Sequence, residues 1–136
     1  EVRHWTQERV RDTFREDAAR LVVDLRPDAQ LCYHDPDHDP GGRYPLDALV
    51  TGRRDVGLLF VANDDQCRDA TISLHMFERW ERPLDSVVIF SNQEAIARKP
   101  MARLGDIAGK LFSSLAVARD RLPDWLTERT EPTSSG

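Results

Sequence analysis

The sequence has 136 residues, of which 40% are apolar and 32% charged, and this length suits one domain with a single core. Its 24 acidic and 19 basic residues give a formal charge of −5, the opposite of the basic surplus typical of proteins that bind chiefly to phosphates. The apolar runs are too short to cross a bilayer, so we expect a soluble, cytoplasmic protein with no membrane partner. Because the chain begins at Glu1 and not at methionine, we also expect a processed product or a domain of a longer protein.

The first forty residues predict one helix and one strand. Apolar residues recur at intervals of three and four from Thr6, which can cap a helix, to Leu25, and Pro27 follows. Residues 30–33 form a short extended run that ends in a loop rich in Asp, His, Pro and Gly. We therefore expect an amphipathic helix followed by a first strand.

Two strands joined by a tight turn are predicted next. Residues 44–50 alternate in polarity, residues 52–55 supply a turn, and residues 56–62 form a nearly continuous apolar stretch. Such a short connection predicts an antiparallel hairpin, because parallel neighbours would need a crossover helix between them.

A second helix and a fourth strand follow the hairpin. Residues 63–65, Asn-Asp-Asp, are capping residues for a helix that ends before Arg82-Pro83. Residues 86–91 are typical of a buried strand.

One long last helix is predicted from Met101 to Leu122, where apolar residues repeat at intervals of three and four until Pro123. Gly105 and Gly109 would lie one turn apart on it and would allow another backbone to approach closely. The apolar stripe is therefore either a face packed on the sheet or the seam of a homodimer.

The loop over residues 34–39 holds two histidines and three aspartates, a ligand set that suits zinc or another divalent transition metal. Pro36 and Pro40 exclude a helix there, so a turn would have to arrange these ligands. The competing and preferred interpretation is a solvated loop rich in turn-forming residues. Cys32 and Cys67 lack the spacing of a zinc ribbon or a disulfide framework.

Four basic residues are candidates for nucleic-acid contacts. Arg53 and Arg54 lie at the tip of the predicted hairpin, and Arg98 and Lys99 follow the fourth strand. Even an acidic protein can present one basic face to phosphates. Ordinary solvation is the competing interpretation, because no aromatic residues are interleaved with them for base stacking.

Several short segments carry a resemblance to a known family. They are Tyr44–Val50 with the single acid Asp47, Leu59–Asp64, Arg82-Pro83 and Val88–Asn92. These segments, and the order helix, strand, hairpin, helix, strand, helix, resemble the restriction-endonuclease-like core of the PD-(D/E)xK nucleases. Within that superfamily the sequence is most similar to the C-terminal domain of a bacterial and phage protein family of unknown function.

The resemblance implies an α/β (α+β) fold in which helices flank a mixed four-stranded sheet. It implies a single nuclease-like domain over residues 1–126, and the polar composition of residues 127–136 predicts a disordered tail.

In active members of the superfamily, two carboxylates hold a divalent metal and a lysine helps to activate water. Asp47 matches the first acidic position, but residues 56–62, the predicted third strand, supply neither an acid nor a lysine. The implied active site is therefore incomplete. Asp64 and Asp65, at the end of the third strand, or Glu16, on the first helix, could complete a metal site with Asp47, although Asp64 and Asp65 serve equally well as helix-capping residues.

We therefore expect a degenerate, non-catalytic nuclease-like domain that needs no cofactor and binds a protein or nucleic-acid partner, in a phage, mobile-element or defence context. The alternative is a Mg²⁺-dependent nuclease in which Asp47 works with Asp64 or Glu16.

Overall fold

The computed structural model describes residues 2–130, with side chains from residue 13 onward. Its elements in chain order are α1 (Val2–Leu25), β1 (Gln30–Tyr33), β2 (Leu46–Val50), β3 (Val56–Val61), α2 (Asp64–Arg79), β4 (Asp85–Phe90), the 3₁₀ turn η1 (Gln93–Ala95), α3 (Arg98–Ile107), β5 (Lys110–Phe112) and α4 (Leu115–Thr130). The fold is α+β, as the sequence predicted.

The strands form one mixed sheet in the order β1-β2-β3-β4-β5. The pairs β1/β2 and β2/β3 are antiparallel, whereas β3/β4 and β4/β5 are parallel. The predicted hairpin is confirmed, because Val50 pairs with Val56 across its turn. The predicted number of four strands is wrong, since β5 forms a fifth.

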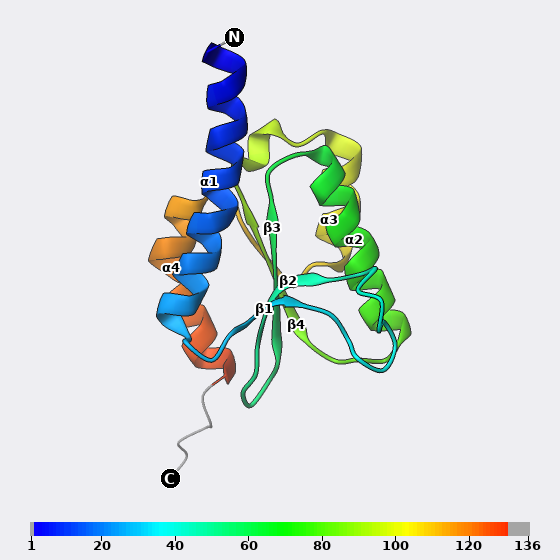
Figure 1. Cartoon of the computed structure of the whole chain (residues 1–136). Helices are drawn as coiled ribbons and strands as arrows, with labels where there is room; N and C mark the ends of the chain where they lie inside the picture. Colours follow the sequence, from blue (N-terminus) through cyan, green and yellow to red (C-terminus); the bar gives the residue numbers. More distant parts are fainter. Residues whose placement is uncertain (1, 131–136) are drawn as a thin grey trace.

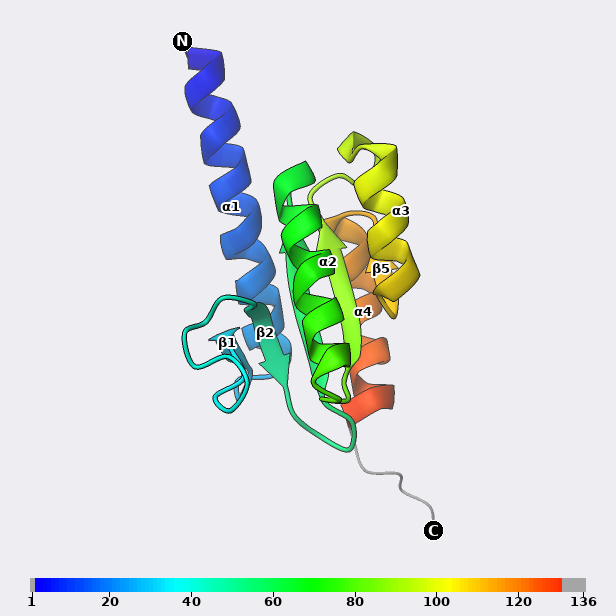
Figure 2. The ribbon, with the colours of Figure 1, turned by 90° about the vertical axis from the view of Figure 1, so that its right-hand side faces the viewer.

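Helices cover both faces of the sheet. Figure 1 shows α1 and α4 together on one side and α2 and α3 on the other, and Figure 2 shows α2 lying along the central strands. Every residue of β3 is buried, which explains its continuous apolar sequence: a strand covered on both faces needs apolar side chains in both directions. Within residues 2–130, no helix combines the length and the apolar composition that crossing a membrane requires.

The predicted single last helix is wrong. The chain leaves α3 after Ile107, forms β5, and starts α4 at Leu115, and Pro123 lies inside α4 and does not end it. The break is fixed by a tertiary contact at Gly109, whose backbone N–H donates to Ser86 Oγ at 2.8 Å. A Cβ on Gly109 would lie 3.0 Å from the Ser86 carbonyl oxygen, so this close approach to β4 favours glycine.

The apolar stripe that suggested a homodimer seam is divided between two cores. Leu104 packs with α2 on one face of the sheet, whereas Ala118 and Leu122 pack with α1 on the other. A continuous seam along one helix therefore does not exist in residues 98–130. A Cβ added at Gly105 would meet no other atom within 4 Å, so this glycine marks no close helix contact.

The turn of the β2–β3 hairpin closes the end of α4. The backbone N–H groups of Arg53 and Arg54 donate to the carbonyl oxygens of Thr130 and Arg129, at 2.9 and 3.2 Å. These bonds satisfy carbonyl groups that a helix leaves unpaired at its C-terminus. The tail predicted from residue 127 is therefore wrong for residues 127–130, which are helical, and residues 131–136 lie outside the described part of the chain.

Candidate functional site

The pairing of β2 with β3 ends early, and Asp47 lies where it ends. The ladder runs from Val50↔Val56 to Ala48↔Leu58, and the same register would next bring Phe60 opposite Leu46. There, however, the Phe60 N–H donates to Asp47 Oδ2 at 2.7 Å, and the Phe60 carbonyl accepts from Arg15 Nη1 at 3.0 Å. Two side chains thus satisfy the backbone groups of a buried strand residue that the ladder no longer pairs.

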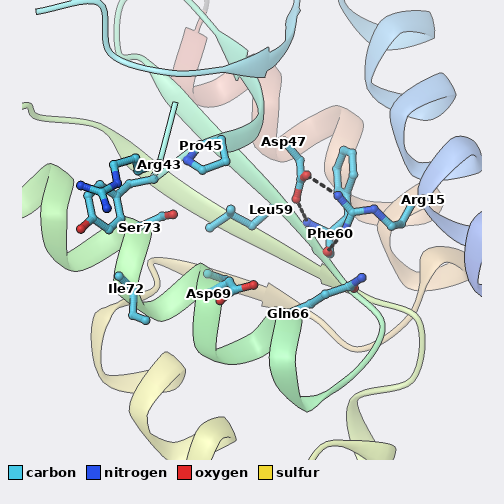
Figure 3. Close-up of a pocket in the computed structure, with 12 residues that line it drawn as sticks. Arg15, Arg43, Pro45, Asp47, Leu59, Phe60, Gln66, Asp69, Ile72 and Ser73 are labelled. Carbon is cyan, nitrogen blue, oxygen red and sulfur yellow. Dashed lines mark hydrogen bonds and ion pairs between the residues drawn. The ribbon is translucent and has the colours of Figure 1, made fainter. Parts of the chain in front are cut away.

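Arg15 and Asp47 also bind one another, through Nη2 and Oδ1 at 2.7 Å. Together with Phe60 they form a closed cluster that joins α1, β2 and β3 (Figure 3). Burial raises the pKa of Asp47 and outweighs the hydrogen bond from Phe60 and the charge of Arg15, both of which lower it. The Asp47 side chain is 22% exposed, so its carboxylate still reaches the surface.

A cleft of about 450 Å³ opens beside this cluster (Figure 3). Its lining comes from α1 (Arg15), from β2 and the segment before it (Arg43, Tyr44, Pro45, Asp47), from β3 (Leu59, Phe60) and from α2 (Gln66, Asp69, Ala70, Ile72, Ser73). This volume lies within the range of small-molecule pockets.

One face of α2 forms a wall of the cleft. Gln66, Asp69, Ala70 and Ser73 are spaced by three, one and three residues, and this spacing places them on the same side of a helix. The start of α2 is fixed by Asn63, whose side chain accepts from the Gln66 N–H at 2.8 Å. Gln66 in turn accepts from the Ala62 N–H, also at 2.8 Å, so this wall is anchored to the end of β3.

Another part of the lining is set by the loop before β2. Asp39 is only 4% exposed, and its two carboxylate oxygens accept from the backbone N–H groups of Arg43 and Tyr44, both at 2.8 Å. Asp35 likewise accepts from the N–H groups of Asp37 and His38. These aspartates therefore organise the loop as turn-forming residues, and no group of three or more metal-ligating side chains is found among residues 13–130.

Glu16, Asp64 and Asp65, the predicted partners of Asp47, do not line this cleft. Glu16 is exposed on α1, and Asp64 Oδ1 accepts from the Ala97 N–H at 2.9 Å, which ties the start of α2 to the start of α3. Each carboxylate oxygen of Asp47 already accepts one hydrogen bond, from Arg15 or from Phe60. The candidate carboxylates therefore do not converge on one point, as the several oxygen ligands of a divalent cation must.

The four predicted nucleic-acid contacts are not brought together. Arg54 makes a bidentate ion pair with Asp85, with both distances 2.7 Å, and Arg53 Nη2 donates to the Glu128 carbonyl at 2.8 Å. Arg98 and Lys99 are exposed at the start of α3. Because β4 runs parallel to β3, the start of α3 lies at the opposite end of the sheet from the hairpin turn.

The residues of the cleft that sequence reasoning missed include Arg43, Gln66, Asp69 and Ser73. The signal for three of them was present in the helical spacing after the cap at Asn63. Nothing in the sequence shows that this face of α2 borders a gap between strands.

In comparisons with known proteins, no family model, no curated protein and no solved structure matches the chain. The function is therefore inferred from the chemistry of the cleft.

Proposed function

We propose that the chain is a nuclease-like binding domain that recognises a protein partner through this cleft and does not hydrolyse phosphodiesters. The observation that carries the proposal is the state of the Asp47 carboxylate, which is bound on one oxygen by Arg15 and on the other by the Phe60 N–H. The carboxylate that would hold the catalytic metal already serves as a structural acceptor.

A metal ion at Asp47 would compete with Arg15 for the carboxylate and would be repelled by its charge. Two unit charges about 4 Å apart near a protein surface interact by roughly 4 kcal/mol, and a divalent cation beside Arg15 would approximately double that repulsion. Moving Arg15 away would in turn leave the Phe60 carbonyl without its side-chain partner.

The nuclease-like part of the proposal is supported by the element order. One helix, an antiparallel run of β1, β2 and β3, a second helix and a parallel β4 follow the order of the restriction-endonuclease-like core. This support is fold analogy, and the function itself rests on the site.

A protein partner is favoured over a nucleic acid by charge. The chain carries a formal charge of −5, and Arg54 at the hairpin turn is already paired with Asp85. Arg53 lies at the same turn and donates to the Glu128 carbonyl, whereas the other two candidate cations, Arg98 and Lys99, lie at the other end of the sheet. Phosphate binding needs several cations on one surface.

The proposal is tested by incubating the chain and its Asp47→Asn variant with supercoiled plasmid and single-stranded DNA, in Mg²⁺ or Mn²⁺. We expect no cleavage by either protein and no Mg²⁺-dependent rise in Tm, because a metal that binds only the folded state would raise it. The Asp65→Asn variant is the matched control, since Asp65 is exposed and lies outside the cleft. Cleavage that disappears in Asp47→Asn and persists in Asp65→Asn would show a nuclease and overturn the proposal.

A further inference from the structure

We infer that the cleft receives a basic side chain, an arginine or a lysine, from the partner polypeptide, with Asp69 as its counter-charge. This inference rests on the proposed function, because it names the chemistry that the same cleft recognises.

The charges inside the cleft leave Asp69 uncompensated. Arg15 and Asp47 neutralise each other in their ion pair. Burial raises the pKa of the Asp39 carboxyl. Two backbone hydrogen bonds and nearby positive charge, including that of Arg43, outweigh burial and lower this pKa. Arg43 therefore already lies near a carboxylate. The Asp69 carboxylate makes no hydrogen bond or ion pair with any residue that the structure describes.

Ser73 supplies a second polar group that lacks a partner. The residue is only 4% exposed, and its hydroxyl forms no hydrogen bond within the described residues. No buried side-chain polar atom of those residues lacks a partner, so the hydroxyl oxygen itself is accessible, and Figure 3 shows it directed into the cleft. Ser73 follows Asp69 by four residues on α2, so their side chains are neighbours on one helix face. A guanidinium or ammonium group carries only donors, and both the carboxylate and the hydroxyl can accept from it.

The apolar part of the cleft fits the stem of such a side chain. Leu59 and Ala70 line it, and Ile72, 48% exposed, is one of two large apolar residues exposed within residues 13–130. Long basic side chains bury their methylene groups against apolar surface while the charged end stays hydrated or paired. The charge of −5 also favours the approach of a basic partner over an acidic one.

The probe for this inference is N-acetyl-arginine amide, followed by ¹H–¹⁵N NMR of the full chain, with N-acetyl-glutamate amide and inorganic phosphate as comparison ligands. We expect saturable shifts of the amide signals of residues 66–73 with the arginine probe. Asp69→Asn should weaken this binding by about tenfold, because it removes the charged acceptor. Asp65→Asn, which removes an exposed carboxylate of the same helix outside the cleft, should leave the affinity unchanged within about twofold.

Three results would overturn the inference. The first is the absence of amide shifts at the cleft with the arginine probe, and the second is equal weakening of arginine-probe binding by Asp65→Asn and Asp69→Asn. The third is binding of the glutamate probe or phosphate in place of the arginine probe, which would make Arg43 the recognition group. The spectrum of each variant before titration shows whether it is folded. Asp47-dependent DNA cleavage would overturn the proposed function. A cleft that does not bind the arginine probe, in a protein that does not cleave DNA, would overturn this inference alone.

Discussion

Arg15 and Asp47 are separated by 32 positions in the sequence, yet Arg15 Nη2 and Asp47 Oδ1 lie 2.7 Å apart. The pair joins α1 to the point where β2 and β3 cease to pair, and it binds the backbone of Phe60 at both its N–H and its carbonyl. This pair therefore stabilises the edge of the cleft.

Asp47→Ala should lower the free energy of unfolding by about 2 kcal/mol, because it leaves the Phe60 N–H and Arg15 without their acceptor. The expected loss is modest because the Arg15 side chain is 39% exposed and solvent partly screens the ion pair. Urea unfolding measures the change. The control is Asp65→Ala, whose side chain is 90% exposed and should change stability by less than about 0.5 kcal/mol. Equal effects of the two substitutions would contradict this role for Asp47.

A double-mutant cycle on Arg15→Ala and Asp47→Ala should give a coupling energy of about 1 kcal/mol, because each substitution removes the same contact. The four proteins are compared by urea unfolding under identical conditions. Strict additivity would mean that the two side chains act on Phe60 independently.

The stability contributed by Asp47 should fall as the pH rises. Its folded-state pKa is raised above the ordinary 3.8, mainly by burial, so the folded state binds the proton more tightly than the unfolded state does. The resulting stabilisation is complete below 3.8 and is lost as the pH rises through the folded-state pKa. Asp47→Asn cannot ionise, so the stability of the wild type relative to this variant should be greater below pH 3.8 than at neutral pH. The opposite trend in urea unfolding would mean that the charge of Arg15 outweighs burial.

Gly52→Ala should destabilise the fold by about 1–3 kcal/mol, because the added Cβ would lie 2.5 Å from the Thr130 carbonyl oxygen and force the hairpin turn away from α4. Gly105→Ala is the matched control. It lies inside α3 with nothing within 4 Å of the added Cβ, so alanine should stabilise the helix by up to about 1 kcal/mol. Thermal unfolding distinguishes the two variants. A Gly52→Ala variant as stable as the wild type would show that the turn can move away from α4 without loss of stability.

Local patterns in the sequence predicted the hairpin and the start of α2, because turn residues and helix caps act over a few positions. They failed between Met101 and Leu122, where the same spacing of apolar residues serves two helices that face different cores. The interruption depends on Ser86, which accepts the Gly109 N–H from 23 positions away. Spacing within one segment carries no information about such a contact.

The candidate site was predictable only in part for the same reason. The resemblance singled out Asp47, but its partners Arg15 and Phe60 come from other elements and are set by tertiary packing. Asp69 is exposed on α2, and no sequence motif pointed to it. Asp69 lines the cleft that opens where the β2–β3 ladder ends early. No local sequence pattern predicts where that ladder ends.

The sheet divides the interior into two compartments with no shared side chains. Val87 and Ile89 of β4 face the α1 and α4 side, and Val88 and Phe90 face the α2 and α3 side. Cavities opened on opposite sides, by Leu104→Ala and by Leu122→Ala, should therefore have additive energetic costs. It follows that the wall of the cleft formed by α2 can be redesigned without repacking the layer between α1 and α4.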